Sequence, residues 1–474
     1  MEQGQDVFDV VVLGGGPAGE NVVERVVRGG LTAAVVESEL IGGECSYWAC
    51  VPSKALLRPV DIVAAARRSP GAAEAVTGQL HAEAALARRD EATSNHDDSG
   101  QVRWLAGLPA DLVRGHGRIT GPRMVEVGSD GSRRRLTARH AVVVATGSRA
   151  AVPPVPGLAE ARPWTSREAT SLRSVPRRLA VIGGGVVASE MSHAVRGLGA
   201  AEVTMLVRGS RLLERMEPLA GEMVSAAFAE EGVSVRTGTG VTRVSRRTDG
   251  SVTLALSDGG TLEADELLVA TGRQLNTDDI GLESVGLEPG RPVAVDDSLR
   301  ADDVDGNWLY AVGDANGRNL LTHMAKYQAR VCGDVIAARA RGEADDASGL
   351  RATADAIGAP QVVFTDPEAC AVGLTEAMAR ERGHEVRAVE YEIGNVTGAY
   401  LQGEDYRGRA KAVVDESRRV LLGVTFVGPG VAELLHSATI AVTAEVPLDR
   451  LWHAVPAFPT VSEVWLRLLE TYGL

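Results

Sequence analysis

The chain has 474 residues, 45% of them hydrophobic, which is enough for about three globular domains. Acidic side chains number 63 against 49 basic ones, and the formal net charge of −14 argues against nucleic-acid binding. The first residues have neither the basic nor the long apolar segment of a secretory signal, and no run approaches the roughly 20 apolar residues of a membrane span. We therefore expect a cytoplasmic protein with no nucleic-acid or membrane partner.

A glycine-rich turn follows the first expected strand. The apolar run at 10–13 is typical of a buried strand, and Gly14, Gly16 and Gly19 then follow the pattern G-x-G-x-x-G. Such glycines permit a tight turn, a close approach of the backbone to a pyrophosphate, and close packing of helix on strand. A second strand ends at Glu37, whose carboxylate can accept hydrogen bonds from a ribose. This order of elements predicts a dinucleotide site rather than a turn without a ligand.

Two of the four cysteines stand close together in the segment 42–54, GGECSYWACVPSK. An ideal helix turns by about 100° per residue, so Cys45 and Cys50 would lie about 140° apart and could not meet within one helix. We therefore expect a turn across 46–49 and a new helix that begins near Pro52. A helix N-terminus close to Cys50 would favour its thiolate form.

Three interpretations of this pair are open: a redox couple, part of a zinc site, or inert thiols. Zinc requires about four ligands, and no second pair stands at zinc spacing. A long chain with so few cysteines is not a disulfide scaffold either. A redox couple is therefore favoured. Cys332 and Cys370 are isolated, and we expect both to be buried fillers of a core.

The nucleotide pattern returns in the segment 177–215. A short apolar strand is followed by Gly183, Gly185 and Ala188 at the same spacing as before. The next strand is followed directly by Arg208, where an acid would be expected for NAD.

The arginine after that strand bears on the choice of nicotinamide cofactor. Arg208 cannot accept a hydrogen bond from a ribose hydroxyl, but a guanidinium pairs well with a 2′-phosphate. Arg211 and Arg215 can add positive charge, whereas Glu214 opposes it. We therefore predict NADPH rather than NADH; the alternative is that Arg208 is an ordinary surface charge.

Short motifs over nearly the whole chain resemble those of the pyridine nucleotide–disulfide oxidoreductases, which include glutathione reductase, lipoamide dehydrogenase, mycothione reductase and mercuric reductase. They are GGGPAG (14–19), GGECSYWACVPSK (42–54), GHG (115–117), VVVATGSR (142–149), GGGVVASE (183–190), VATGRQLNT (269–277), YAVGDANG (310–317), LLTHMAKYQARV (320–331) and VVFTDPEACAVGLTE (362–376). The resemblance implies an α/β fold with two Rossmann-like dinucleotide-binding domains, for FAD and NAD(P)H, plus a C-terminal α+β dimerisation domain.

The resemblance also implies a domain order and a set of partners. FAD-binding sequence is expected in 1–156, an NAD(P)H-binding domain in 157–275, further FAD-binding sequence in 276–350, and an interface domain in 351–474. The family usually forms homodimers in which the partner's C-terminal segment completes each active site. The expected cofactors are FAD and NADPH, and the expected partners are a second copy of the chain and a small-molecule disulfide or thiol.

Five catalytic residues follow from the same resemblance. Cys50 is the thiolate that faces the flavin, and Cys45 is the interchange thiol that attacks the substrate. Lys54 matches a lysine beside flavin N5, and Glu190 matches its ion-pair partner. Glu463 matches the glutamate that orients the family's catalytic histidine. A cation near N5 stabilises reduced flavin, and a carboxylate keeps that cation charged and in place.

The nucleotide contacts can be assigned in the same way. Contacts to FAD are implied at Gly14, Gly16, Pro17, Ala18, Gly19, Glu37, Gly43, Glu44, Cys45, Lys54, Gly117, Ala145, Thr146, Gly147, Gly313, Asp314, Met324 and Ala325. Contacts to NADPH are implied at Gly183, Gly185, Val186, Val187, Ala188, Glu190, Arg208, Arg211, Val241 and Gly272. Within the first set, Asp314 is expected at the flavin ribityl chain and Gly117 near the adenine.

The C-terminal segment 453–470 departs from the family pattern. Pro459, Thr460 and Glu463 are kept, but Phe458 stands where the family has its catalytic histidine. Phenylalanine cannot carry a proton, and a positioned acid–base group is typically worth about 10²–10⁴-fold in rate. We therefore expect much of the usual glutathione or lipoamide turnover to be lost.

Three reactions remain open. The first is disulfide reduction in which His453 or the leaving thiol handles the proton. The second is electron transfer from reduced flavin to a quinone, a metal ion or dioxygen, and the third is the reverse oxidation of a dithiol. Mercury is disfavoured because mercuric reductases have a C-terminal cysteine pair, whereas no cysteine follows Cys370. Phe458, together with Tyr47 and Trp48, suggests an aromatic mouth and a bulky or aromatic sulfur substrate.

Overall fold

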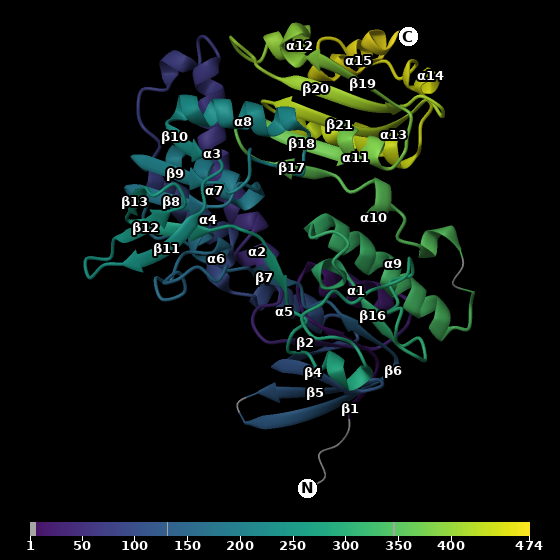
Figure 1. The fold of residues 1–474 in the computed structure, drawn as a ribbon. Coiled ribbons are helices and arrows are strands. Elements are labelled where there is room, and N and C mark those ends of the chain that lie inside the picture. Colours follow the sequence, from purple (N-terminus) through teal and green to yellow (C-terminus); the bar gives the residue numbers. More distant parts are fainter. Residues whose placement is uncertain (1–5, 130, 345–346) are drawn as a thin grey trace. The chain divides into compact units, whose positions relative to one another are not determined.

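The computed structural model describes residues 6–129, 131–344 and 347–474, and the chain forms two compact units (Figure 1). Unit 1 comprises Met1–Val51, Asp90–Arg149 and Arg273–Asp355, and unit 2 comprises Pro52–Arg89, Ala150–Gly272 and Ala356–Leu474. Each unit combines helices with parallel and antiparallel strands, which confirms the expected α/β class. Within the described ranges, no helix is long and apolar enough to cross a bilayer.

A seven-stranded sheet forms the centre of unit 1. Its path is β3-β2-β1-β6-β5-β4, with β16 also paired to β6; β5 is antiparallel to both of its neighbours, and the other pairs are parallel. The strands are β1 (Asp6–Leu13), β2 (Ala33–Glu37), β3 (Ala110–Arg114), β4 (His116–Gly121), β5 (Met124–Ser129), β6 (Ser132–Val144) and β16 (Leu309–Ala311). Val10, Val11 and Val12 are fully buried, as expected for a parallel strand with both faces covered.

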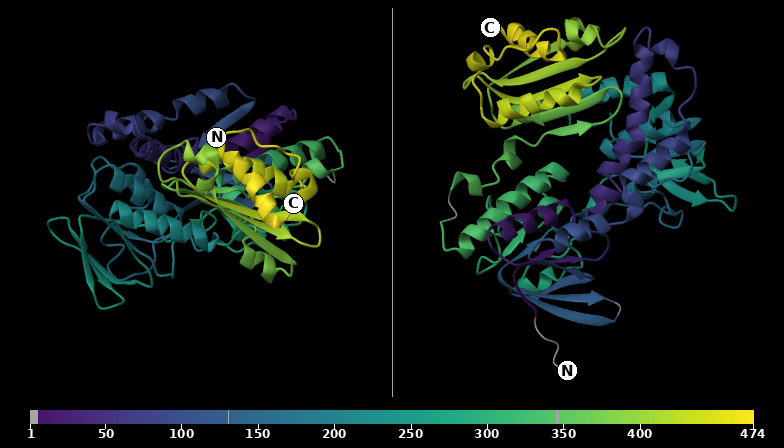
Figure 2. Two further views of the ribbon diagram at one scale, coloured as in Figure 1. Left: turned by 90° about the horizontal axis from the view of Figure 1, so that it is seen from above. Right: turned by 180° about the vertical axis from the view of Figure 1, so that it is seen from behind.

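Helices α1 (Pro17–Arg28) and α9 (Thr322–Ala340) pack against each other in unit 1 (Figure 2). The approach is close, because a Cβ on Gly29 would overlap the side chain of Ala337. Arg25 and Asp334 form an ion pair between the two helices. The shorter helices of this part are α2 (Gly43–Tyr47) and α5 (Ser99–Ala106). Segments far apart in the chain are thus held in one layer.

The nucleotide-type layer of unit 2 has two small sheets. One is parallel with the order β10-β9-β8-β14, and the other is antiparallel with the order β11-β12-β13. The strands are β8 (Arg178–Ile182), β9 (Glu202–Leu206), β10 (Val233–Arg236), β11 (Val241–Arg246), β12 (Val252–Leu256), β13 (Thr261–Ala264) and β14 (Glu266–Val269). The helices of this layer are α3 (Cys50–Arg68), α4 (Ala82–Ala92), α6 (Ser166–Thr170), α7 (Val186–Gly197) and α8 (Pro218–Glu231). Short strands β7 (Ser148–Ala150) and β15 (Arg273–Leu275) pair where the chain leaves and re-enters unit 1.

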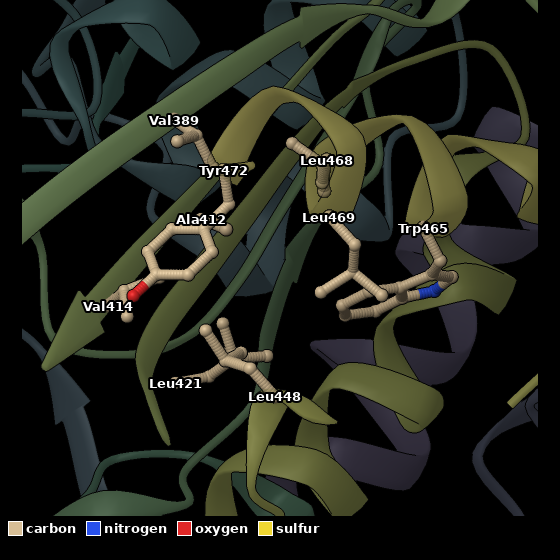
Figure 3. A pocket seen from close by; sticks show the side chains of 9 residues that line it. All are labelled: Val389, Ala412, Val414, Leu421, Leu448, Trp465, Leu468, Leu469 and Tyr472. Atoms are coloured by element: carbon tan, nitrogen blue, oxygen red, sulfur yellow. The ribbon is translucent and has the colours of Figure 1, made fainter. Parts of the chain in front are cut away.

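A five-stranded antiparallel sheet, β17-β18-β21-β20-β19, forms the C-terminal layer of unit 2. Its elements are β17 (Gln361–Val363), β18 (Glu368–Gly373), β19 (Val386–Glu392), β20 (Arg409–Asp415), β21 (Val420–Gly428), α10 (Ala354–Ile357), α11 (Glu376–Glu381), α12 (Thr397–Tyr400), α13 (Leu435–Thr443), α14 (Leu448–Leu451) and α15 (Val464–Tyr472). Figure 3 shows Trp465, Leu468 and Leu469 of α15 opposite Val389 and Ala412 of the sheet, in a small apolar cavity. Its apolar lining marks it as a packing gap of the core rather than a polar ligand site.

A buried cluster of charges joins this sheet to α8. Lys411 on β20 is 7% exposed, and its Nζ lies 3.0 Å from Glu217 Oε2 and 2.9 Å from Glu376 Oε2. The other oxygen of Glu217 accepts a hydrogen bond of 2.6 Å from the Glu376 backbone N–H. Such buried charges are tolerated because each one has a partner.

Candidate active site

The turn after β1 requires glycine for steric reasons. Gly14 has a φ of +104°, and a Cβ there would overlap the carbonyl oxygen of Ala145. A Cβ on Gly19 would overlap the carbonyl oxygen of Gly14. Gly16 is the N-cap of α1, so the first backbone N–H groups of this helix are left for an anion. The geometry is that of a pyrophosphate cradle.

A cavity of about 410 Å³ opens beside this turn in unit 1, and its lining includes Glu37, Gly117, Thr146 and Arg149. Glu37 accepts hydrogen bonds of 2.7 Å from the backbone N–H groups of Gly15 and Glu39, which orients its carboxylate. Thr146 Oγ1 is buried and has no hydrogen-bond partner among the described residues. An orphaned hydroxyl and a fixed carboxylate in one cavity fit a polar ligand such as the adenosine part of FAD.

The sequence motifs did not single out Arg149 as a site residue. Its guanidinium lies 2.5 Å from Asp278 and 2.9 Å from the Asn276 side chain, and all three residues line the cavity. Arg149 is the last residue of the motif VVVATGSR and stands two positions after Gly147, an expected FAD contact. Its place in this motif is the feature of the sequence that could have pointed to it.

Other expected FAD contacts meet in the same unit. Gly313 has a φ of +66°, and a Cβ there would lie 3.0 Å from Cβ of Ala325 and 3.5 Å from Cβ of Ala18. Gly43 has a φ of +59°, and a Cβ there would lie 2.8 Å from Cα of Gly16. Met324 is buried nearby on α9. The structure therefore brings these small residues together, although they come from distant motifs.

Arg273 connects two further expected contacts. Its guanidinium lies 2.9 Å from Glu44 Oε2 and 3.6 Å from Asp314 Oδ2. It also donates a 2.5 Å hydrogen bond to Ser148 Oγ, whose hydroxyl in turn donates to Asp314. Arg273 and Ser148 were missed at the level of sequence, because an ion pair between segments so far apart leaves no local pattern.

The cysteine segment differs from the expectation at one point. Cys45 lies on the short helix α2, a turn follows at Trp48 and Ala49, and α3 begins at Cys50 itself rather than near Pro52. The turn across this segment is as expected, but the helix starts earlier, since a residue at its first position needs no intrahelical partner for its N–H.

Both residues are free cysteines, and they are close enough for Cys50 to affect the pKa of the Cys45 thiol. The hydrogen bond with Cys50 and burial together raise the pKa of the Cys45 thiol, while Thr322 and Lys326 oppose this rise. The hydroxyl Oγ1 of Thr322, the first residue of α9, lies 3.3 Å from Cys50 Sγ. A dithiol of this kind can form a disulfide and release two electrons.

The expected aromatic mouth is wrong in one residue. Tyr47 is only 2% exposed, and its hydroxyl donates a 3.0 Å hydrogen bond to the carbonyl oxygen of Ile41. Its ring packs against Trp48 and His96, with centroids 5.7 Å and 6.1 Å away. Tyr47 is therefore part of the core of unit 1, because its hydroxyl found a backbone acceptor, and only Trp48 stays half-exposed.

The expected ion pair between Lys54 and Glu190 is present in unit 2. Lys54 Nζ lies 2.7 Å from Glu190 Oε2 and 4.8 Å from the centroid of the Phe364 ring. The other oxygen of Glu190 accepts a 3.1 Å hydrogen bond from the backbone N–H of Phe364. Glu190 is 3% exposed, so the pair holds the lysine ammonium at a defined place on α3. Phe364 was missed by the sequence assignment.

The second glycine turn has the same steric logic as the first. Gly183 has a φ of +133°, and a Cβ there would overlap the carbonyl oxygen of Ala270. Gly185 is the N-cap of α7, followed by the exposed Val186, the half-buried Val187 and the buried Ala188. Val241 starts β11, and the carbonyl of Gly272 accepts a hydrogen bond from the Ala151 N–H. The structure thus supplies a second helix N-terminus that can face a pyrophosphate.

Arg208 and Arg211, which both follow β9, differ in whether the guanidinium is free to bind a phosphate. Arg208 is exposed two residues after the end of this strand. One nitrogen of Arg211 donates to the carbonyl oxygens of Glu214 and Met216, at 2.8 and 3.1 Å, so this guanidinium is engaged with its own loop. The expectation that Arg211 contacts the phosphate therefore loses support. The expectation that Arg208 contacts it stays a prediction. Glu214 accepts a hydrogen bond from the Ser210 N–H and also belongs to this loop.

The C-terminal segment has an exposed aromatic where the family has its base. Phe458 is 73% exposed, and His453 is exposed as well. Glu463 is 9% exposed; its Oε1 accepts a 2.6 Å hydrogen bond from Arg467, and its Oε2 has no partner among the described residues. Arg467, not noticed in the sequence, thus holds the glutamate that would otherwise orient a histidine.

The two isolated cysteines are buried fillers, as expected. Cys332 and Cys370 are both 0% exposed, and burial raises the pKa of each thiol. Among the described residues, no group of three or more His, Cys, Asp or Glu side chains could hold a metal ion.

The chain has two glycine-rich turns of the dinucleotide-binding type and a pair of cysteines at the start of a helix. Together these features define a nucleotide-dependent dithiol oxidoreductase. The sequence pattern of one family, pyridine nucleotide-disulphide oxidoreductase, matches residues 8–329, and its dimerisation domain matches residues 359–468. The chain belongs to this family of FAD-dependent enzymes, which confirms the resemblance read from the motifs. It is a flavoprotein oxidoreductase that uses a pyridine nucleotide, and it carries the domain through which the family forms homodimers.

Similar proteins span most of the chain. A mercuric reductase from Shigella flexneri is 34% identical over 96% of this chain and 78% of its own length. A dihydrolipoyl dehydrogenase from Rhizobium etli is 29% identical over 98% of both chains. LpdA from Mycobacterium tuberculosis superposes with a TM-score of 0.83 at 25% identity, covering 99% of this chain and 100% of its own. A Cu(II) complex of the flavoprotein disulfide reductase RclA from Escherichia coli has a TM-score of 0.83 at 23% identity, over 98% and 99% of the two chains, and shares the fold.

Proposed function

We propose that the chain reduces a small disulfide with electrons from NADPH, which pass through FAD to the Cys45–Cys50 couple. One observation carries this proposal: Cys45 and Cys50 are free cysteines that interact with each other, and Thr322 Oγ1 lies 3.3 Å from Cys50 Sγ. In this role Cys45 is the thiol that attacks the substrate, and Cys50 is the thiol that exchanges electrons with the flavin. When bound, FAD supplies hydride acceptance and two-electron transfer.

The same proposal assigns the domains and the FAD contacts. Residues 1–156 and 276–350 bind FAD, 157–275 bind NADPH, and 351–474 form the interface. The polar cavity of unit 1 supports an adenosine site at Glu37 and Gly117, and we assign Asp314, which lies 3.6 Å from Arg273, to the ribityl chain. The pyrophosphate would lie at the glycine turn before α1.

Lys54 and Glu190 act as a charge pair in this proposal. The ammonium of Lys54 stabilises negative charge on reduced flavin, and the carboxylate of Glu190 holds that ammonium in place. Support comes from the 2.7 Å ion pair and from the burial of Glu190.

Preference for NADPH over NADH rests on Arg208. An exposed guanidinium two residues after β9 can pair with a 2′-phosphate, and no acidic residue occupies this position. The kinetic test compares kcat/KM for NADPH and NADH in the parent. Equal use of the two cofactors would contradict the assignment.

We further propose a bulky or aromatic sulfur compound as the substrate. With Tyr47 buried, this part of the proposal depends on the half-exposed Trp48 and the exposed Phe458. Phe458 would act in a homodimer, where the family places this segment at the partner's active site. A disulfide panel in which oxidised glutathione is the best substrate would refute the preference.

A second candidate is transfer of electrons to a metal ion, a quinone or dioxygen. The substitution at Phe458 favours it, because these acceptors need no acid–base group at a leaving thiol. Mercuric reductases are among the similar proteins, but this chain has four cysteines and none after Cys370. Reverse operation, in which a dithiol is oxidised, uses the same residues.

Anaerobic titration with NADPH tests the proposed route of electrons. After two electrons, a long-wavelength thiolate–flavin absorption band is expected in the parent. The Cys45→Ser variant serves as the control, since it leaves Cys50 without a disulfide partner. Direct bleaching of the flavin in the parent, with no such band, would defeat the role of the pair. Steady-state assays with disulfides, quinones, metal ions and dioxygen then separate the candidate acceptors.

A further inference from the structure

Phe364 stands where three separate parts of the sequence meet in unit 2. It follows β17, and its half-buried side chain packs against the hydrophobic core to which α3 and α7 both contribute. Lys54 comes from α3, and Glu190 comes from α7. The catalytic residues and cofactor contacts expected from the sequence do not include Phe364, so its contacts with this charge pair have no assigned role.

Phe364 contacts both members of the charge pair. Its backbone N–H donates a 3.1 Å hydrogen bond to Glu190 Oε1, and the centroid of its ring lies 4.8 Å from Lys54 Nζ. The other oxygen of Glu190 lies 2.7 Å from the same ammonium. The carboxylate is therefore held by a backbone donor, and the ammonium is held by a carboxylate and by the face of an aromatic ring.

The two charges differ in how far burial fixes them. The side chain of Glu190 is 4% exposed, whereas that of Lys54 is 37% exposed. Lysine carries its ammonium on a flexible stem, so a single ion pair leaves the ammonium free to swing around the carboxylate oxygen. A ring face near a partly exposed cation adds an attraction worth roughly two- to fivefold in an equilibrium constant. Two attachments from different directions thus confine the ammonium more than either one alone.

The segment that carries Phe364 is itself anchored. Asp366, two residues further on, forms an ion pair with Arg68, the last residue of α3. Thr365 is 2% exposed, and its hydroxyl donates a 2.7 Å hydrogen bond to the carbonyl oxygen of Pro367. The connection between β17 and β18 is therefore tied to α3 twice, once through the ring of Phe364 and once through Asp366, which holds the ring against the lysine.

We propose that Phe364 is a positioning residue for the flavin: its backbone orients the Glu190 carboxylate, and its ring confines the Lys54 ammonium that stabilises the reduced cofactor. The inference rests on the role of Lys54 proposed above. It extends that role, because a residue of the segment 351–474, outside both nucleotide-binding regions, then determines how much positive charge the flavin meets.

The reduction potential of bound FAD, measured by equilibration with a reference dye, tests this charge and requires neither NADPH nor a disulfide. Lys54→Met should make reduction about tenfold less favourable, which for two electrons is a potential about 30 mV more negative. Phe364→Leu keeps the backbone donor and an apolar side chain but removes the ring face. About half of that free-energy effect should then be lost, which is about threefold or about 15 mV. Phe364→Tyr keeps the ring and should match the parent.

A double variant separates positioning from packing. If Phe364 acts through the lysine, Phe364→Leu should cause no further shift of the potential when Lys54→Met is already present. Val362→Ala is the matched control: it removes apolar volume from β17 at a side chain that packs against the core of the C-terminal sheet, and it should leave the potential unchanged. A potential equal to the parent's in Phe364→Leu, or the same shift with and without Lys54, would overturn the proposal.

Fluorinated phenylalanines at position 364 provide a second series should Phe364→Leu destabilise the fold. Fluorine withdraws electron density from the face of the ring and changes its size little, so the cation is attracted less while the packing is kept. The potential should become steadily more negative from phenylalanine to trifluorophenylalanine, with an unchanged melting temperature. A flat series would refute the role of the ring. If the parent reduces no disulfide, the reductase function fails, but these potentials still decide the role of Phe364.

Discussion

Replacing His193 with glutamine is expected to weaken unit 2 in a pH-dependent way. The imidazole of His193 on α7 is 2% exposed and lies between Asp61 Oδ1, at 3.2 Å, and Glu231 Oε2, at 3.1 Å. Its ring also stacks on Phe228. Burial alone would lower the pKa of His193, but the hydrogen bonds and charges of the two carboxylates outweigh it and raise the pKa to about 10. The histidine is therefore an imidazolium that links α3, α7 and α8 at neutral pH.

The size of the effect follows from the shift. A rise from 6.5 to about 10 corresponds, at about 1.36 kcal/mol per pKa unit, to an upper limit of about 5 kcal/mol. Because the side chains of Asp61 and Glu231 are each about a third exposed, solvent screening reduces this figure, and we expect about 2–3 kcal/mol. A group with a raised pKa in the folded state stabilises it fully below pH 6.5. That contribution is lost as the pH rises through about 10.

Thermal melts of the FAD-loaded enzyme at pH 6, 8 and 10 measure this contribution. The His193→Gln variant should melt several degrees below the parent at pH 6 and 8, and the two should converge near pH 10. His436→Gln, at an exposed position on α13, is the control and should follow the parent throughout. A gap between parent and His193→Gln that stays the same from pH 6 to pH 10 would show that no imidazolium is held there.

Three further predictions concern the cofactors and the C-terminal segment. Gly19→Ala should abolish FAD retention or destabilise the fold by about 2 kcal/mol or more, since its Cβ would overlap the carbonyl oxygen of Gly14; normal flavin content and melting would contradict this. Arg208→Ala should raise KM for NADPH by about 10-fold or more and leave KM for NADH nearly unchanged, and a parallel change in both would remove the arginine from the cofactor site. Phe458→His should raise turnover of an aliphatic disulfide by about tenfold or more, provided that Glu463 can exchange Arg467 for the ring; steady-state rates that stay flat over pH 6–9 would count against this segment as the missing acid–base position.

Much of the fold was predictable because its signals are local. The glycine turns at Gly14 and Gly183 need positive φ angles and close backbone contacts that other residues cannot adopt, so the sequence pattern and the geometry correspond directly. The pairing of Lys54 with Glu190 was predictable only through the family resemblance, since the two residues come from different motifs.

Tertiary partners decided the environment of residues whose local sequence says little about them. Tyr47 is an aromatic residue of the kind that often contacts substrates. In the structure its hydroxyl donates a hydrogen bond to the backbone carbonyl of Ile41, and its ring is buried. Arg211 had the right charge, yet its nitrogen is bonded to two carbonyl groups of its own loop. No pattern in the neighbouring sequence reports which acceptor lies within reach after folding.

Lys411 and its carboxylates constrain how this chain can change over evolutionary time. The lysine sits almost out of contact with water between Glu217 and Glu376, which come from separate segments of the sequence. Loss of the lysine alone would leave the buried carboxylate of Glu217 without its cation, and loss of Glu217 would leave the buried lysine with only the partly exposed carboxylates of Glu376 and Glu390. The three positions are therefore expected to be inherited as a set: homologues should keep all three or exchange them together for apolar side chains. We expect chimeras that take α8 and the C-terminal sheet from different relatives to fold only when both relatives have charged side chains at these three positions, or both have apolar ones.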